Sequence, residues 1–403
     1  MRRFVYLLVW LIVSSVSAQI QRDTIFNFPP DSSVFIRTKG PMPYLNYGLG
    51  EDRLGGAKMG TIDSLVLLKV TGQYKNLYRV RLTPHFSAWI PQNFTKRDTL
   101  VKLPLQYLTG SWKVWGDTHF DYVSIPLPDR LAYRSWQEVN PSKIIVDVFG
   151  ATTNTNWITQ LRSVKEIKSV DYEQVADEQL RITICLRHSQ HWGYRVGYEG
   201  RRLVIAVKRQ PEKLKLKTLT IAIDAGHGGT NLGARGLRSK QWEKDLNLSI
   251  ALHLQRELER KGVKVLMSRT NDTLFNNNDR VLRFRTQKPD LLVSIHNNAA
   301  GDTTKTRGTS TYYKHLGYRS LSQTILKRLL DMDLAEYGNV GRFNFALNSP
   351  TEYPNVLVEG AFMSHPADEA WLINDDFRNR MAKQIRKGIE DWLKKVRKGQ
   401  DFE

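Results

Sequence analysis

The chain changes its hydrophobic pattern near residue 210, and this change constrains the fold more than any other feature. Before it, short apolar-alternating segments are separated by Gly, Pro, Asn and Asp, as in small β-rich domains. These segments are 33–37, 65–70, 77–82, 86–90, 144–148, 179–185 and 203–207. After residue 218, strand-like runs alternate with helical ones, which predicts an α/β domain. The fold class expected is therefore α/β, with small β-rich domains in front.

The segment 211–217 separates these two parts. It reads Pro-Glu-Lys-Leu-Lys-Leu-Lys, a charged stretch with proline at its start, so we interpret it as a linker. Beyond it we expect a buried strand at 219–224, a helix at 240–261 with an apolar residue at every fourth position, and a basic amphipathic helix at 377–396. Further strands are expected at 263–268, 291–295, 309–313 and 356–359.

Residues 1–18 have the features of a secretory signal peptide. Two arginines follow Met1, then comes a run of about ten apolar residues, and then small residues that end at Ala18. A spanning helix needs roughly 20 apolar residues, so we favour cleavage after Ala18 over a membrane anchor. No later stretch is apolar enough to span a bilayer, and no cysteine follows the run to carry a lipid. We expect an exported protein in the periplasm or cell envelope, with no membrane span after signal cleavage.

The net charge limits the kinds of partner that the protein can bind, and the cysteine content limits its disulfides. The formal net charge of +20 suits nucleic acid or an anionic surface, and export argues against nucleic acid. The anionic cell envelope remains, although a basic solvated surface with no specific partner has comparable weight. A single cysteine, Cys185, excludes an internal disulfide, and we interpret it as a buried strand residue rather than a nucleophile.

Two histidines and a glutamate have the pattern of a catalytic metal site. His227 and His296 each follow a predicted strand, and ligands collect at the carboxyl ends of strands in α/β sheets. Glu243 lies near the start of the helix that follows the glycine-rich turn around His227. Two imidazoles and one carboxylate leave a tetrahedral zinc ion one open position, as catalysis requires.

A fourth residue, Glu359, ends the apolar run 355–359 and is placed to carry the proton of an attacking water. Singly, each residue has an ordinary explanation: a hydrogen-bonded surface histidine, a glycine turn, a carboxylate complementing the helix dipole, or a solvated strand-end charge. Their combination, in this order along the chain, favours a zinc hydrolase.

The segments 221–229, 243–248, 294–299 and 356–364 resemble the motif set of the type-3 N-acetylmuramoyl-L-alanine amidases. The resemblance covers about residues 218–397. It implies a zinc amidase domain with a central mixed sheet flanked by helices. It makes His227, Glu243 and His296 the zinc ligands and Glu359 the catalytic acid/base. It also implies cleavage of the amide bond between N-acetylmuramic acid and L-alanine in peptidoglycan, and this choice of bond rests on the resemblance alone.

The sequence departs from the family pattern at Ser364-His365, where relatives often have Ser-Asn. We interpret His365 as part of a surface turn, although it could contact substrate or metal. Some relatives carry an inhibitory helix after the second histidine motif; the short segment here predicts an ordinary helix at 320–330 and no such plug. Asp224 could hold His227 from behind or be purely structural. Asn298 is a weak candidate for orienting substrate.

The N-terminal half carries two further resemblances. Residues 99–210 are similar to the AMIN domain on segments 143–150, 164–172 and 194–207, which implies localisation in the envelope and possible septal or envelope protein partners. Residues 19–98 look like a small bacterial Src-homology-type barrel. Its aromatics could line a groove, but we favour ordinary core and surface positions for Tyr44, Tyr47, Tyr78 and Trp89. His188 and His191 have metal-ligand spacing, and we interpret them as part of a polar turn.

Two other functions stay open on the residues alone. One is a zinc peptidase or deacetylase that acts on the same polymer, because the metal site does not select the amide bond. The other is a non-catalytic wall-binding protein, against which the presence of all four site residues counts.

Overall fold

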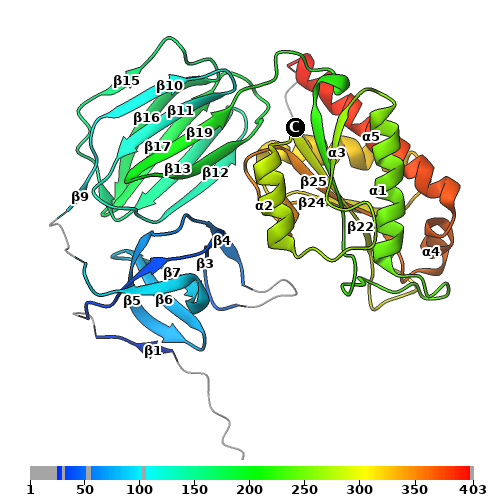
Figure 1. Cartoon of the computed structure of the whole chain (residues 1–403), viewed down its shortest axis with the longest axis horizontal. Helices are drawn as coiled ribbons and strands as arrows, with labels where there is room; N and C mark the ends of the chain where they lie inside the picture. The colour runs from blue at the N-terminus through cyan, green and yellow to red at the C-terminus, as the bar shows by residue number, and fades with distance from the viewer. Residues whose placement is uncertain (1–24, 30–31, 51–55, 102–105, 400–403) are drawn as a thin grey trace, which may run out of the picture.

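The computed structural model describes residues 25–29, 32–50, 56–101 and 106–399. Figure 1 shows three units along the chain: a small β-unit, a β-sandwich and an α/β domain. The predicted signal peptide, residues 1–18, lies outside the described residues. Within the described ranges, no helix has the length and apolar character needed to cross a membrane.

The first unit is a strongly curved antiparallel sheet in the order β4-β3-β7-β6-β5-β2-β8, with β1 paired to β5. Its elements are β1 (Phe26–Asn27), β2 (Phe35–Thr38), β3 (Tyr44–Asn46), β4 (Lys58–Thr61), β5 (Leu67–Tyr74), β6 (Leu77–Thr83), β7 (Phe86–Pro91), η1 (Gln92–Phe94) and β8 (Thr95–Asp98). Trp89 is buried in this unit, whereas Tyr47 is exposed.

The second unit packs two main sheets face to face, in the orders β15-β10-β11-β19-β18 and β12-β13-β17-β16. Its strands are β9 (Tyr107–Leu108), β10 (Trp112–Gly116), β11 (Phe120–Pro126), β12 (Tyr133–Glu138), β13 (Lys143–Phe149), β14 (Ala151–Thr152), β15 (Ile158–Gln160), β16 (Ile167–Ala176), β17 (Gln179–Leu186), β18 (Tyr194–Glu199) and β19 (Arg202–Lys208). The prediction that Cys185 is buried is wrong. Side chains alternate along β17, so Ile182 and Ile184 face the core while Cys185 lies half-buried on the other face.

The third unit is built on a six-stranded sheet in the order β21-β20-β22-β25-β23-β24. Its elements are η2 (Leu216–Thr218), β20 (Thr220–Ala225), α1 (Glu243–Glu259), β21 (Lys264–Met267), α2 (Asn277–Gln287), β22 (Leu291–Asn298), β23 (Thr309–Tyr312), η3 (Leu316–Tyr318), α3 (Arg319–Leu330), β24 (Glu336–Val340), η4 (Ala346–Asn348), β25 (Asn355–Phe362), α4 (Pro366–Leu372) and α5 (Asp375–Arg397). Strands β21, β20, β22 and β25 are parallel, whereas β23 runs antiparallel to β25. The predicted mixed sheet flanked by helices is thus confirmed.

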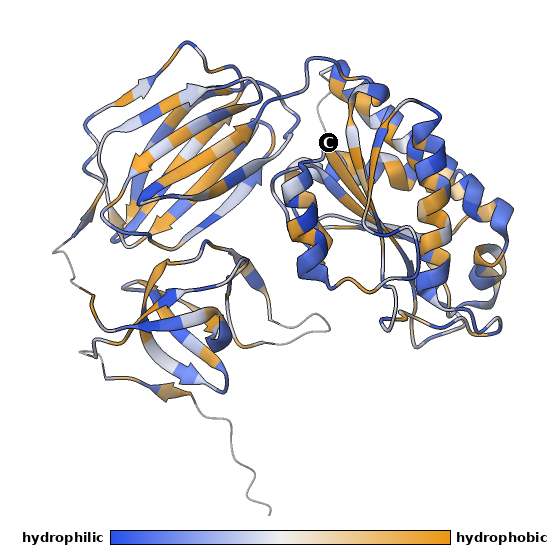
Figure 2. Cartoon of the chain, viewed as in Figure 1, coloured by the Kyte–Doolittle hydropathy of each residue, from blue (hydrophilic) through white to orange (hydrophobic). Residues whose placement is uncertain are grey.

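The helices cover the two faces of this sheet unequally. Helices α1, α3 and α5 bury one face, and α2 covers the other together with η4. The apolar stripe predicted for residues 240–261 is buried in the larger core, although α1 begins only at Glu243. Figure 2 shows apolar strands in the middle of the domain and polar outer faces on the helices, as an α/β core requires.

The segment 211–217 connects the sandwich to the α/β domain, and it packs against the α/β domain. Leu214 and Leu216 are each only 9% exposed and pack into the core of the α/β domain. Two leucines separated by one lysine point to the same side of an extended chain, which lets them dock while the lysines stay in water.

The loop between β17 and β18 strengthens this junction. Trp192 is 2% exposed, belongs to the core of the α/β domain and packs on Trp392 of α5 with ring centroids 5.1 Å apart. Beside it, Gln190 donates a hydrogen bond to the carbonyl of Gly317 (2.8 Å) and accepts one from the Trp392 indole (3.0 Å). The sandwich is therefore fixed to the α/β domain by buried contacts.

Replacing Trp192 with alanine tests this docking. Removing a fully buried indole from the core costs about 3–5 kcal/mol, so Trp192→Ala should lower the midpoint of urea unfolding of the α/β domain markedly. The exposed Trp157 (63%) is the matched control, and Trp157→Ala should change stability by no more than about 0.5 kcal/mol. Equal midpoints for the two variants, followed by circular dichroism, would contradict the packing described here.

Candidate metal centre

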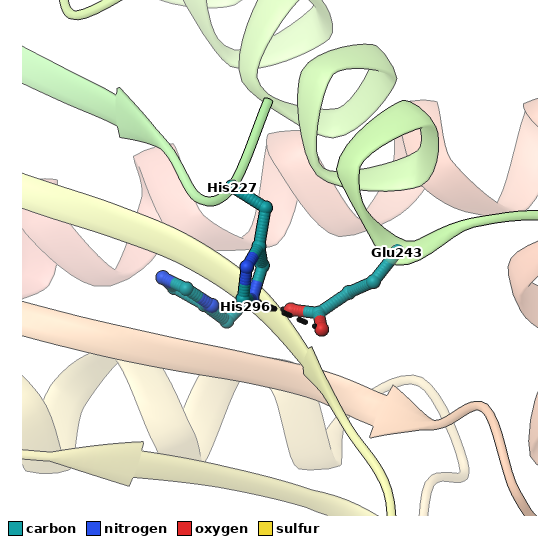
Figure 3. Close-up of side chains that lie close together, drawn as sticks. All are labelled: His227, Glu243 and His296. Atoms are coloured by element: carbon teal, nitrogen blue, oxygen red, sulfur yellow. Dashed lines mark hydrogen bonds and ion pairs between the residues drawn. The ribbon is translucent and has the colours of Figure 1, made fainter. Parts of the chain in front are cut away.

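His227, Glu243 and His296 converge at one point beside the sheet. Their ligand atoms all lie within 4.8 Å of one another. His227 lies in the loop after β20, Glu243 is the first residue of α1, and His296 lies within β22 (Figure 3). The expectation that His296 follows its strand is wrong, because β22 continues to Asn298. Three segments that are far apart in the sequence thus supply one side chain each.

The carboxylate of Glu243 lies between the two imidazoles. Its Oε2 is 3.1 Å from His227 Nε2, and its Oε1 is 3.1 Å from His296 Nδ1. On the far side of the first ring, His227 Nδ1–H donates to Asn231 Oδ1 at 2.8 Å. That hydrogen bond places a proton on Nδ1, so Nε2 is the ring atom that faces Glu243 and would offer its lone pair to a bound metal.

Glu243 is held as an anion in a buried position. Burial alone would raise its pKa, but the hydrogen bonds and charges of His227 and His296 hold the pKa well below its usual range. Backbone N–H groups of Ala234 (2.9 Å) and Asn297 (3.2 Å) also donate to this carboxylate.

Glu243 in turn changes the pKa of His227. Burial would lower the pKa of His227, yet the Glu243 carboxylate raises it above its ordinary value. The three side chains form a cluster of two nitrogen donors and one carboxylate, the donor set expected of a catalytic zinc site.

The glycine before His227 makes the convergence possible. A Cβ on Gly226 would lie 2.3 Å from the ring of His296, so a larger residue there would push the second ligand away. His227 itself has a φ of 61°, in the left-handed region that non-glycine residues rarely adopt. The predicted sharp turn is present, and Gly226 also provides the space for the second histidine.

A buried arginine holds the loop of His227 from behind. Arg280 of α2, 3% exposed, donates to the carbonyl oxygens of Ala225 (2.7 Å) and His227, and to Asp224 at 2.6 Å. Asp224, which also accepts a hydrogen bond from Ser294 (2.7 Å), therefore acts on His227 through Arg280 and not by direct contact. Burial would raise the pKa of Asp224, but the Arg280 guanidinium keeps it low.

A second buried arginine, Arg269, donates to the carbonyls of Ala225 (3.0 Å), Gly226 (2.9 Å) and Lys244 (2.7 Å). Sequence reasoning missed both arginines. Arg269 comes directly after a predicted strand, where a polar residue in a motif can indicate a site, but a single arginine on α2 carries no such signal.

Glu359 lies next to the cluster. It is the register partner of His296 on the neighbouring parallel strand and is 6% exposed. Adjacent strands are about 4.8 Å apart and paired residues point to the same face, so the carboxyl group flanks the second histidine. The expectation that Glu359 ends its strand is wrong, because β25 continues to Phe362. The residues before and after Glu359 in this strand are buried, as is Glu359 itself.

Aromatic rings cover one side of the cluster. Phe345 lies parallel to the ring of His296, with centroids 6.5 Å apart, and packs against Phe343 and Tyr312. The hydroxyl of Tyr312 accepts a long hydrogen bond, 3.5 Å, from Asn298. Asn298 thus lies near the site, and its role toward substrate stays a prediction.

The remaining histidines do not join the cluster. His365 lies in the turn directly before α4, as predicted, but it is buried at 8% exposure and does not lie on the surface. His188 pairs with Glu166 at 2.6 Å, and the buried His191 lies 2.9 Å from the Glu138 carbonyl oxygen. Burial lowers the pKa of His191 to about 4, which keeps it neutral.

Comparison with known proteins follows the same division of the chain. Residues 221–391 match the family model described as N-acetylmuramoyl-L-alanine amidase, and residues 113–207 match that of the AMIN domain. Among curated proteins, the chain is similar to the probable cell wall amidase LytH of Staphylococcus aureus, with 34% identity over 193 residues. That alignment covers 48% of this chain and 63% of the relative, so the chain spans less than two thirds of the relative's length.

Two solved structures are similar over the α/β domain. The catalytic domain of CwlV from Bacillus (Paenibacillus) polymyxa var. colistinus is 32% identical, with a TM-score of 0.42. The match covers 98% of that domain and 44% of this chain. An N-acetylmuramoyl-L-alanine amidase from Clostridium difficile 630 is also 32% identical, with 97% of it and 44% of this chain covered and a TM-score of 0.42. By the matched family models, residues 221–391 form a domain of the N-acetylmuramoyl-L-alanine amidase family, and residues 113–207 form an AMIN domain ahead of it.

Proposed function

We propose that this protein is a zinc-dependent hydrolase of the cell envelope that cleaves the amide bond between N-acetylmuramic acid and L-alanine in peptidoglycan. The observation that carries the proposal is the buried Glu243 carboxylate between His227 and His296, inside the domain that matches the amidase family. The family match supports the choice of bond, which the cluster alone would leave open.

The donor set fits zinc. Because Nδ1 of His227 is hydrogen-bonded to Asn231, its Nε2 is the atom that would ligate a metal. Nδ1 of His296 faces the same point, and Glu243 adds an ionised oxygen. We propose these three residues as the ligands. A zinc ion held there would supply a Lewis acid that activates water and polarises the scissile carbonyl.

Glu359 is the proposed acid/base. Its position beside His296 on the neighbouring strand suits a group that takes a proton from the attacking water and delivers it to the leaving nitrogen. Arg280 and Asn231 are proposed as positioning residues, because one holds the backbone of His227 and the other holds its ring.

An extracytoplasmic location agrees with the AMIN domain and with relatives that are named as cell wall amidases. We propose export through the signal peptide 1–18 to the periplasm or cell envelope, with peptidoglycan as the substrate and septal or envelope proteins as possible contacts of the AMIN domain. The bounds proposed for the units are 19–98, 99–210 and 218–397.

The products of digestion test the choice of bond. Purified mature protein should release stem peptides with a free L-alanine amino terminus from peptidoglycan, identified by mass spectrometry. Cuts found only within the peptide would instead establish the zinc peptidase alternative. Loss of acetyl groups alone would establish a deacetylase, and no change in the polymer would leave a wall-binding protein.

The variant Glu359→Gln separates proton transfer from metal binding. It should reduce turnover about 10²–10⁴-fold while zinc content, measured by inductively coupled plasma mass spectrometry, stays at the wild-type level. Glu336→Gln, an exposed carboxylate on β24 of the same sheet, is the matched control and should keep full activity. Full activity of Glu359→Gln would remove this residue from the mechanism, and loss of zinc would make it a ligand.

Removal of the metal tests the ligand set. Dialysis against a chelator should abolish digestion, and added zinc should restore it. His227→Ala should lower the zinc content of the purified protein, whereas His253→Ala, on the far part of α1 beside Asp375, should not. Unchanged zinc content in His227→Ala, with a wild-type circular dichroism spectrum, would refute the proposed site.

A further inference from the structure

A large cavity lies where the three units meet, apart from the metal centre. Its volume is about 1750 Å³, and its walls include Tyr44 and Lys58 of the first unit, Trp136 of the sandwich, and Lys314 and Glu352 of the amidase domain. A space of this size admits a short peptide or an oligosaccharide unit.

Three of the acidic side chains that line this cavity have partners in the protein. Glu352 pairs with Arg285 at 2.6 Å, and Asp290 pairs with Lys208 at 2.8 Å. Asp63 accepts a hydrogen bond from the backbone N–H of Tyr198 at 2.5 Å. The carboxylates of Glu352 and Asp290 are therefore already paired with cations other than Lys58 and Lys314.

Two lysines in the same cavity lack such partners. Across the described ranges, neither Lys58 nor Lys314 has a carboxylate within ion-pair distance, and both are half-buried. Lys58 lies over the ring of Tyr44, 4.6 Å from its centroid. Burial and the repulsion of Lys58 lower the pKa of Lys314 to about 8, as expected for two neighbouring cations that have no carboxylate paired with them.

One short segment separates this cavity from the metal centre. Arg342, Asn344 and Ala346 line the cavity, whereas Phe343 and Phe345 alternate with them and pack toward Tyr312 and His296. A ligand held by Lys314 would thus lie on the other side of the segment that covers the second histidine.

We propose that this cavity binds the carboxylate groups of a wall stem peptide, with Lys58 and Lys314 as the cations that contact them. The choice of ligand rests on the proposed function, because the proposed reaction releases a peptide with a free amino group and two carboxylates. One carboxylate belongs to its D-Glu residue and the other is at its C-terminus. The exposed acids Glu199 and Glu212 also line the cavity and suit that amino group, whereas they would repel a polymer that carries only phosphate.

Calorimetric titration of the full mature, zinc-loaded protein with the synthetic peptide L-Ala-γ-D-Glu-L-Lys-D-Ala tests the proposal. Lys58→Gln and Lys314→Gln should each raise the dissociation constant about tenfold or more, because each removes a charge-assisted contact. Lys327→Gln, an exposed lysine on α3, is the matched control and should bind as the wild type does. Amidation of the peptide carboxylates should weaken binding in the same way.

Three results would overturn the proposal. The first is no binding of the peptide, or binding that both lysine variants leave unchanged. The second is saturable binding of inorganic phosphate through these lysines without binding of the peptide. The third is loss of peptide binding in Glu359→Gln, which would locate the peptide at the metal centre. Thermal melts identify a misfolded variant, and in that case the other lysine variant decides.

Failure of the peptide-binding proposal can be distinguished from failure of the proposed amidase function. A protein that releases stem peptides from peptidoglycan but does not bind the tetrapeptide through Lys58 and Lys314 keeps the function and loses this inference. A protein that binds the tetrapeptide through the lysines but cleaves no amide keeps the cavity as a peptide site and loses the function.

Discussion

The buried charge of Glu243 is the constraint around which the amidase domain is arranged. A carboxylate at 5% exposure is costly unless several donors neutralise it. Two imidazoles and two backbone N–H groups do so, and they come from the loop after β20, the segment before α1, and β22. These segments must therefore meet at one point, and the small Gly226 and the buried Arg269 and Arg280 are what this convergence requires.

The sequence predicted the parts of this site that follow a local pattern. His227, Glu243 and His296 could be found because each follows or begins an element whose periodicity is clear, and the structure brings their ligand atoms together. Arg280 could not be found, because an arginine on a helix with a polar surface pattern looks solvated in the sequence. Its burial against Asp224 depends on tertiary packing that no local pattern encodes.

The same limit explains where the fold was predicted less well. The elements that were predicted agree with the structure within a few residues, since alternation and four-residue spacing are strong signals. Other elements, such as β11, β24 and α2, were not predicted. The segment 211–217 gave only two leucines among lysines, too few to distinguish a docked chain from a free one. Trp192 likewise lies in a loop, where a sequence pattern does not show which neighbouring domain will bury it.

Docking of the two β-units changes what the amidase domain presents to its surroundings. A flexible tether would leave the outer face of residues 342–346 in water, whereas here that face forms one wall of a cavity between the units. Phe343 and Phe345 pack on Tyr312 and favour one arrangement of this wall. A ligand in the cavity could shift the metal centre only if it bound a second arrangement more tightly. With the aromatic packing intact, the segment acts as a fixed partition between this cavity and the cluster of His227, Glu243 and His296.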